Sequence, residues 1–294
     1  MKTNARASNR LLAVLEALLV TFLWSSSYVL VKVGLQEIDP LTLVAYRYTV
    51  ASLVLLPLAL SRGHGALLRE RGIPLRLGVL GFLGITLAQG FQVLGLFLLP
   101  AVSVTFLLNL TPITVLALGV AALNERPTKL QLTGIAMAVA GAALFFNDPL
   151  TSVSLPGILV TLLSGVGWGA YIVLGRRLSI GDQVPVLGLT AFSMAGGTVL
   201  LLATAFLFEG FTVVSAAGWG IILWLGVVNT ALAFFMWNRA LGRLEAFEIS
   251  VLQNTMLIQI AVLAWIFLGE RFALAKIPAM ALVFLGALIV QLRK

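Results

Sequence analysis

The sequence predicts an all-α integral membrane protein with ten transmembrane helices arranged as two inverted five-helix repeats. Three observations lead to this fold class: the composition, the spacing of the apolar segments and an internal repeat. Of the 294 residues, 60% are apolar and only 10% are charged, and the mean hydropathy is +1.07. A typical soluble domain is roughly 45–50% apolar and roughly 25% charged. A soluble fold could not bury this much apolar surface, so most of the chain must lie in lipid.

The same composition excludes several classes of function. The chain has no cysteine, and its one histidine, His64, lies in a charged loop, so we expect no metal site and no cofactor. It lacks the phosphate-binding motif of ATP-driven motors and any constellation typical of an enzyme. The net charge of +8 fits basic membrane loops better than a nucleic-acid partner. The expected partners are a small-molecule substrate and the lipid bilayer, and the oligomeric state stays open.

Apolar runs of the length that a membrane span requires, roughly 17–25 residues, recur along the chain. The first follows three basic residues in the manner of a signal peptide, but it is too long and contains Glu16, so an uncleaved helix is expected. The second begins at Pro40. Little more than residues 98–100 separates the third span from the fourth, so nine spans is the alternative count. The ten expected spans are 11–33, 40–60, 75–96, 101–122, 129–146, 155–175, 185–208, 218–238, 247–268 and 275–291.

The basic residues predict the orientation of these spans. With the N-terminus inside, fifteen of the nineteen Lys and Arg residues fall at inner ends, three fall at outer ends (Lys32, Arg271 and Lys276), and Arg47 lies within a span. Cytoplasmic segments are rich in Lys and Arg. We therefore expect both termini in the cytoplasm, and the compact loops favour a prokaryotic inner (plasma) membrane.

The second half of the chain repeats the first. A shift of 145 residues places Asn109 on Asn254, and a shift of 144 places Trp24 on Trp168. Each half, 11–146 and 155–291, holds five expected spans, and an odd number inverts the second half relative to the first. Inverted repeats are typical of secondary transporters, whose site lies where the halves meet near the membrane midplane. The further matches are Pro40 with Pro185, Gly81 with Gly226, Ala101 with Ala246, Glu125-Arg126 with Glu270-Arg271, Gly141 with Gly286 and Lys32 with Arg176.

Several motifs occur in the same order as in a known family. They are Trp24-Ser-Ser-Ser-Tyr28 with Lys32, Arg47, Asn109-Leu-Thr-Pro112, Asn124-Glu125-Arg126 and Gly269-Glu270-Arg271. With them, residues 11–291 resemble the two tandem EamA-type units of the drug/metabolite transporter superfamily. The resemblance implies export or exchange of small metabolites, often amino acids, by alternating access. The second half departs from the first, with Met256-Leu257 in place of Thr111-Pro112 and Phe192 in place of Arg47.

Two charged residues within spans need a reason, because a charge in lipid costs roughly 2.5–3.5 kcal/mol on insertion scales. Arg47 could clamp a substrate carboxylate, since a guanidinium matches it in a fork. Alternatively, it could satisfy helix-end carbonyls or extend toward water. Glu16 could exchange protons for coupling, as in the small multidrug antiporters of the same superfamily. Alternatively, it faces water at the inner interface or pairs with a basic residue.

Uncharged polar and aromatic residues complete the candidate site. Amides that faced lipid would leave donors unsatisfied, so they face other helices or a wet cavity. Bonds between helices would contribute roughly 0.6 kcal/mol each. Aromatic residues could wall a cavity or lie at the interfaces. Pro112 predicts a helix break. The candidate substrate-binding residues are Trp24, Ser27, Tyr28, Arg47, Gln89, Gln92, Asn109, Trp168, Tyr171, Asn229, Trp237, Gln253 and Asn254.

These patterns favour a secondary transporter that exports or exchanges a small polar or amphipathic, amino-acid-like metabolite by alternating access. One alternative is a multidrug/proton antiporter that uses Glu16. An intramembrane enzyme or a scaffold without transport activity is the remaining class, and no catalytic constellation supports the enzyme.

Overall fold

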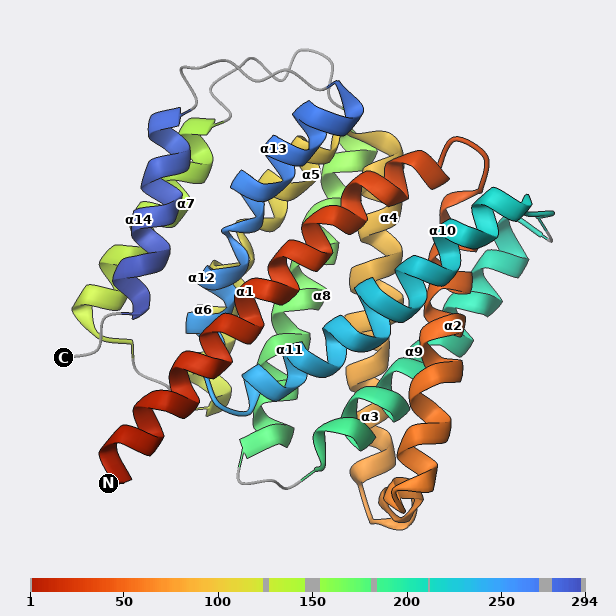
Figure 1. The fold of residues 1–294 in the computed structure, drawn as a ribbon, viewed down its shortest axis with the longest axis horizontal. Helices are drawn as coiled ribbons and strands as arrows, with labels where there is room; N and C mark the ends of the chain where they lie inside the picture. Colours follow the sequence, from red (N-terminus) through yellow and green to blue (C-terminus); the bar gives the residue numbers. More distant parts are fainter. Residues whose placement is uncertain are drawn as a thin grey trace.

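The computed structural model describes residues 2–123, 127–145, 154–180, 184–210, 212–269 and 277–291. Over these ranges the chain forms helices joined by short connections, and no strand occurs among the described residues (Figure 1). The first half contains α1 (Lys2–Gly34), α2 (Pro40–Ser61), the 3₁₀ turn η1 (His64–Arg69), α3 (Ile73–Gly81), the π-helical turn η2 (Phe82–Gln89), α4 (Gly90–Leu98), α5 (Ala101–Leu108), α6 (Thr111–Leu123) and α7 (Lys129–Phe145). The second contains α8 (Leu155–Ser179), α9 (Val186–Phe208), α10 (Ala216–Gly226), the π-helical turn η4 (Val227–Leu232), α11 (Ala233–Leu241), α12 (Ala246–Gln253), α13 (Met256–Leu268) and α14 (Ile277–Gln291).

Local chemistry sets the starts of several helices. Pro40 occupies the first turn of α2, where a missing N–H leaves no bond unmade. The side chains of Ser154 and Ser215 accept from the backbone N–H groups of Gly157 and Gly218, at 3.3 and 3.0 Å, and so cap α8 and α10. Such caps supply partners for N–H groups that would otherwise be unpaired in lipid.

Seven stretches are long and apolar enough to cross a membrane, by length and composition. They are Arg10–Gly34, Pro40–Ser61, Ile73–Leu98, Leu155–Ser179, Val186–Phe208, Ala216–Leu241 and Glu248–Leu268, and Thr111–Ala122 is a shorter apolar helix. The chain is thus helical and membrane-embedded as expected, with fewer full-length spans among the described residues than the ten predicted. The difference arises because the expected span 101–122 is divided into α5 and α6, and because α7 and α14 have only 17 and 15 residues.

The two halves show the same sequence of irregularities. The π-helical turns η2 and η4 begin 145 residues apart, at Phe82 and Val227. The breaks between α5 and α6 and between α12 and α13 are also 145 residues apart, at 109–110 and 254–255. A π-helical turn leaves backbone carbonyls available to other donors and is frequent at functional sites. In each half a carbonyl of this turn accepts from a side chain, Ala88 from Ser164 and Asn229 from Arg47.

The break in the first half lies at 109–110, before Pro112, where the sequence predicted it. Pro112 is the second residue of α6, in the first helical turn, where its missing N–H is tolerated. The second half breaks at the equivalent place, after Asn254, although Met256 and Leu257 replace Thr111 and Pro112. Proline is therefore not required for the break.

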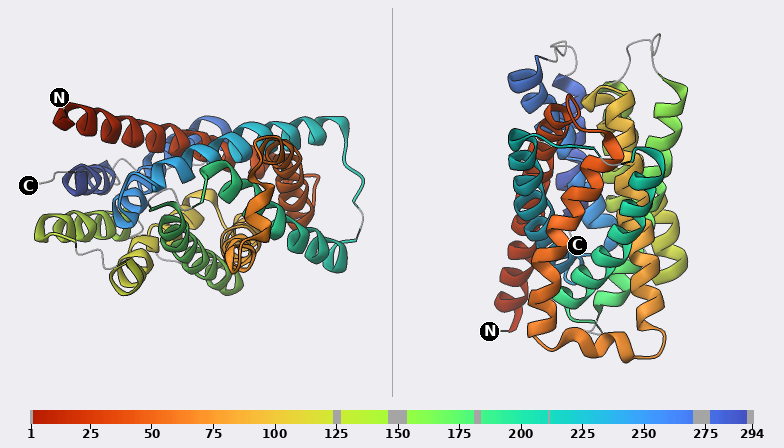
Figure 2. Two further views of the ribbon diagram at one scale, coloured as in Figure 1. Left: turned by 90° about the horizontal axis from the view of Figure 1, so that it is seen from below. Right: turned by 90° about the vertical axis from the view of Figure 1, so that its right-hand side faces the viewer.

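The helices pack as a bundle with α7 and α14 paired along one side (Figures 1 and 2). Glycine permits this pairing, because a Cβ on Gly286 would lie 2.6 Å from the carbonyl oxygen of Gly134. The start of α1, the end of α2, the start of α3 and the end of α8 gather at the lower end of the bundle in Figure 1. Helix ends that the charge pattern assigns to one side of the membrane thus lie together.

Candidate functional site

A cluster of aromatic rings joins α1, α8 and α11 at the centre of the bundle. Trp24 lies 5.5 Å from Trp168 and 4.8 Å from Trp237, measured between ring centroids. Trp168 stacks on Tyr171 at 4.9 Å, and Phe234 lies 5.4 Å from Trp24. Tilted and edge-to-face pairs of this kind favour one arrangement of the rings. The cluster therefore fixes three helices of both halves around one point.

A small cavity lies against this cluster. It combines apolar walls with polar groups from both halves, the composition typical of a site that orients a small molecule. Its free volume is about 30 Å³, enough for little more than one water molecule. A substrate would require the helices to separate. The lining residues are Trp24, Ser27, Tyr28, Val31, Arg47, Gln89, Gln92, Val93, Leu96, Leu108, Ser164, Trp168, Gln253 and Met256.

Arg47 brings a buried cation to this cavity, with only 4% of the residue exposed. Its Nε donates to the Thr230 hydroxyl at 2.5 Å, and its Nη2 donates to the Asn229 carbonyl at 3.3 Å. Both partners are neutral, and no carboxylate forms an ion pair with Arg47 within the described ranges. A guanidinium has five N–H donors. Arg47 thus uses some of them to hold its position and lines the cavity with an uncompensated charge.

The π-helical turn η4 makes this arrangement possible. The Asn229 carbonyl accepts from Arg47 and also from Trp24 Nε1, at 3.1 Å. The Asn229 amide donates to the Leu23 carbonyl at 2.5 Å and to Ser26 Oγ at 3.1 Å. One residue of the second half therefore ties α1 and α2 of the first half to the cavity wall.

Asn109 and Asn254 line a second small cavity of about 20 Å³, beside the central one. Tyr28, Leu108, Gln253 and Met256 line both cavities, so the two are contiguous. Asn109 Nδ2 donates to the Thr105 carbonyl at 2.7 Å, whereas Asn109 Oδ1 and Asn254 Nδ2 have no hydrogen-bond partner. The matched helix breaks thus present one acceptor and one donor to a common space.

Two other hydrogen bonds connect aromatic residues with amides at the cavity wall. Trp168 Nε1 donates to Gln253 Oε1 at 2.7 Å, and Gln92 Nε2 donates to the hydroxyl of Tyr28. Each pair joins two helices, α8 with α12 and α1 with α4. The polar residues therefore orient the rings as well as line the cavity.

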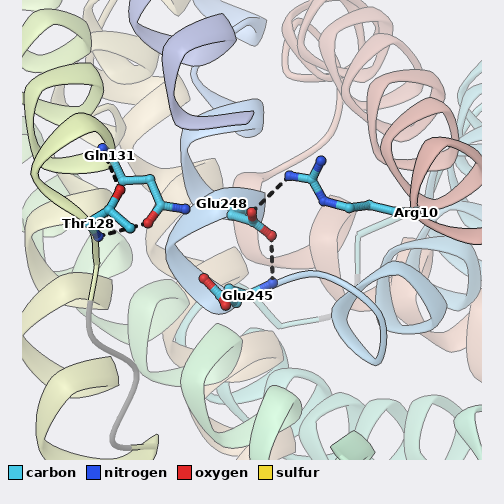
Figure 3. Close-up of polar contacts among 5 residues, drawn as sticks. All are labelled: Arg10, Thr128, Gln131, Glu245 and Glu248. Carbon is cyan, nitrogen blue, oxygen red and sulfur yellow. Dashed lines mark hydrogen bonds and ion pairs between the residues drawn. The ribbon is translucent and has the colours of Figure 1, made fainter. Parts of the chain in front are cut away.

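Glu16 lies outside the residues that line either cavity. It is 5% exposed and forms a two-point ion pair with Arg239 of α11, in which Arg239 Nε lies 3.0 Å from Glu16 Oε2. Arg243 Nη1 lies 4.0 Å from the same carboxylate. A second ion pair, 3.0 Å long, joins Arg10 to Glu248 in the first turn of α12 (Figure 3). Together they fasten the first half of α1 to α11 and α12.

The structure separates the sequence candidates into groups. Eight of them line the central cavity: Trp24, Ser27, Tyr28, Arg47, Gln89, Gln92, Trp168 and Gln253. Asn109 and Asn254 line the adjacent one. Tyr171, Asn229 and Trp237 line neither. Tyr171 bonds to Asn238 at 3.0 Å, and Trp237 packs in the aromatic cluster behind the cavity.

Three further residues contribute that were not among the candidate substrate-binding residues. Thr230 anchors Arg47, Ser164 donates to the Ala88 carbonyl of η2 at 2.6 Å, and Phe234 completes the aromatic cluster. The shift by 145 residues pairs Arg47 with Phe192 and says nothing of Thr230, because a repeat relates equivalent positions and not contacts. The motifs Asn124-Glu125-Arg126 and Glu270-Arg271 lie outside the described residues.

A membrane-embedded helical bundle with a buried polar and aromatic cavity between its two halves is the architecture of a membrane transporter. The chain belongs to the EamA-like transporter family, whose model matches residues 11–147 and 155–292. It is an integral membrane protein with a small-molecule substrate, and its family and relatives are transporters rather than enzymes.

Relatives in several prokaryotes agree with this assignment. An "uncharacterized transporter" of Archaeoglobus fulgidus is 28% identical over 86% of this chain and 88% of its own. A "probable amino-acid metabolite efflux pump" of Salmonella typhimurium is 25% identical, covering 93% and 92%. A "probable biotin transporter" of Pseudomonas aeruginosa is 31% identical, covering 81% and 82%. One protein crystal structure superposes with a TM-score of 0.77 at 23% identity, over 97% of this chain and 96% of the other, which shows a shared fold.

Proposed function

We propose that this transporter exports or exchanges a small polar or amphipathic metabolite that carries a carboxylate, such as an amino acid or its derivative. The buried guanidinium of Arg47 is the observation that carries the proposal. A buried cation whose protein partners are all neutral is costly, and a carboxylate would compensate it in a two-point contact. The relatives named for amino-acid metabolites and for biotin, itself a carboxylic acid, are consistent with this substrate class.

The rest of the substrate would lie against the rings. Trp24, Tyr28 and Trp168 offer flat apolar surfaces, while Gln92 and Gln253 supply hydrogen bonds. A few polar groups among apolar ones orient the ligand and leave the side chain of the substrate free to vary. Asn109 Oδ1 and Asn254 Nδ2 are a free acceptor and donor for a polar group such as an amine or a carbonyl.

Alternating access by two inverted halves, 11–146 and 155–291, accounts for the free volume of only about 30 Å³. In this mechanism the halves rock around a site at their interface. The matched π-helical turns and helix breaks support ten spans in two repeats, since each irregularity occurs once in the described part of either half. The proposed orientation has both termini in the cytoplasm of a prokaryotic cell and the chain in its inner membrane.

A flux assay with purified protein in liposomes tests the function. The panel pairs each amino acid or carboxylate metabolite with its amide, with and without a pH gradient. We expect the carboxylates to be transported and the uncharged amides to be transported far more slowly. Equal flux of acid and amide would remove the carboxylate from the proposal, and flux of hydrophobic cations alone would favour the multidrug alternative. Dependence on the pH gradient separates proton coupling from solute exchange.

The orientation is tested separately with single cysteines, because the chain has none. Cysteines placed at Asp39 or Glu209 should react with an impermeant thiol reagent in intact cells. Cysteines at Arg69 or Arg177 should react only after the membrane is opened. Labelling of Arg177→Cys from outside would refute the inverted arrangement.

A further inference from the structure

A third cavity opens on the outside of the bundle, far larger than the two at its centre. Its volume is about 760 Å³, and it lies between the second half of α2, the start of α9 and the continuous helix formed by η4 and α11. Its walls are apolar and open: Leu58, Val227 and Leu232 are 48%, 42% and 48% exposed. An apolar groove on a membrane-spanning surface faces lipid.

Helix divergence creates this groove. α2 touches the junction of α10 and η4 at Gly226, the last residue of α10, where a Cβ would lie 2.6 Å from Val50. Beyond that contact α2 and α11 separate toward the end of the bundle where α2 ends (Figure 1). Leu55 and Ala231, which are nearly fully buried, line the groove close to this contact. The groove therefore runs from the middle of the membrane to its boundary with water.

Two basic side chains stand at the boundary end. Arg62, at the end of α2, and His64 both line the groove. Gly63 between them has φ +79°, a left-handed turn that brings both flanking residues to the same cavity. His64 packs against Gly188 of α9, where a Cβ would lie 3.3 Å from His64 Cβ. The Nδ1 atom of His64 is buried and has no hydrogen-bond partner.

We propose that this groove binds an acidic phospholipid, with an acyl chain along the apolar walls and the headgroup phosphate against Arg62 and His64. The chemistry of the two ends matches that of the lipid. Arginine recognises phosphate through two parallel N–H groups, and His64 lines the same end of the groove. The same connection carries Arg69 and Arg71 against the single acid Glu70, and Arg76 follows in α3. Basic residues beside a membrane attract anionic lipids.

The site borders the machinery proposed for transport. Val227, Ala231 and Leu232 belong to η4 and line the groove, while Asn229 and Thr230 of the same turn hold Arg47 on its other side. A bound chain would pack against this turn. Lipid binding itself is measured without substrate, so its outcome is independent of whether the proposed transport function holds.

Titration of the purified full-length protein with dioleoyl phosphatidylglycerol and dioleoyl phosphatidylcholine, followed by native mass spectrometry, tests the site. We expect the first phosphatidylglycerol to bind at least about fivefold more tightly than phosphatidylcholine. Arg62→Ala should reduce this preference to less than about twofold. Arg69→Ala, on the same connection but outside the lining, should keep it.

Leu58→Trp is a second variant, which fills the groove from an exposed position and should weaken the binding of both lipids. Arg62 also complements the negative end of α2. If this were its only role, Arg62→Ala would lower Tm equally in both lipids and would leave the preference for phosphatidylglycerol intact. Equal affinity of the wild type for the two lipids, or equal loss in Arg62→Ala and Arg69→Ala, would overturn the proposal. The proposal would also be overturned if inorganic phosphate alone raised Tm as much as phosphatidylglycerol does.

Discussion

Two contacts between the halves occupy matching positions and differ in chemistry. In one, α2 packs against η4, and Arg47 meets Asn229 and Thr230. In the other, α9 packs against η2, and the residues at the equivalent positions are Phe192, Gly84 and Ile85. The packing of a helix on a π-helical turn occurs in both contacts, but the buried charge and its hydrogen-bond partners occur in only one of them.

The apolar contact is the more tightly packed of the two. At the junction of α3 and η2, a Cβ on Gly81, the last residue of α3, would lie 2.1 Å from the carbonyl oxygen of Ser193, and one on Gly197 would lie 2.5 Å from the carbonyl oxygen of Gly81. Thr86 adds a hydrogen bond to the Gly197 carbonyl at 3.0 Å. This difference suggests a division of labour in which the α9–η2 contact supports the fold and the α2–η4 contact binds an anion. Two predictions test that division, and two more compare other matched positions of the halves.

The largest effect is expected from Arg47. Arg47→Ala should lower carboxylate flux in liposomes at least about tenfold, because hydrogen bonds to a charged group contribute about 1.5–3 kcal/mol. Arg47→Lys should retain part of the flux, since lysine keeps the charge and loses the fork. Phe192→Leu is the matched control and should transport at close to the wild-type rate. Full flux by Arg47→Ala, at normal expression, would remove Arg47 from the site.

Packing should be more sensitive at Gly81 than at its repeat partner Gly226. Gly81→Ala drives a Cβ into backbone, whereas Gly226→Ala meets the Val50 side chain at 2.6 Å and the Arg47 carbonyl at 2.9 Å. Overpacking costs roughly 1–3 kcal/mol, and we place Gly81→Ala at about the upper end and Gly226→Ala below it. Thermal unfolding in detergent, followed by size-exclusion chromatography, measures the difference. A lower Tm for Gly226→Ala than for Gly81→Ala would reverse the comparison.

The two asparagines at the helix breaks should contribute in both halves. Asn109→Ala and Asn254→Ala should each reduce flux by about two- to tenfold, the effect of one neutral hydrogen bond of roughly 0.5–1.5 kcal/mol. Folding should change little, because each side chain leaves one polar atom without a protein partner. Wild-type flux in the double variant would show that this cavity is not used by the substrate.

The smallest effect is expected from Glu16, which has no charged counterpart in the second half, where Val160 occupies the equivalent position. Arg239 is 39% exposed, so loss of this ion pair should cost only about 1 kcal/mol. Glu16→Gln should lower Tm slightly and leave the response of flux to a pH gradient unchanged. Loss of that response with an unchanged Tm would instead support the proton-coupling alternative.

Local sequence patterns were sufficient for much of the fold. The apolar runs predicted the helices, because a helix satisfies its own backbone N–H and C=O groups in lipid and few other structures do. The repeat paired Asn109 with Asn254, and the structure shows that both lie at helix breaks. Pro112 was the wrong physical reason for the first break, since the second half breaks in the same place without proline.

Contacts between distant segments were decided only by the tertiary structure. Arg47 was recognisable as a buried charge, but Asn229 and Thr230 are about 180 positions away and became its partners because α2 crosses a π-helical turn. Glu16 was recognisable as an unusual acid, and the packing of α1 on α11 paired it with Arg239. Tyr171 and Trp237 were aromatic candidates of the same kind as Trp24 and Trp168, and helix rotation placed them behind the cavity. A sequence records which groups must be satisfied in lipid, and packing determines which groups satisfy them.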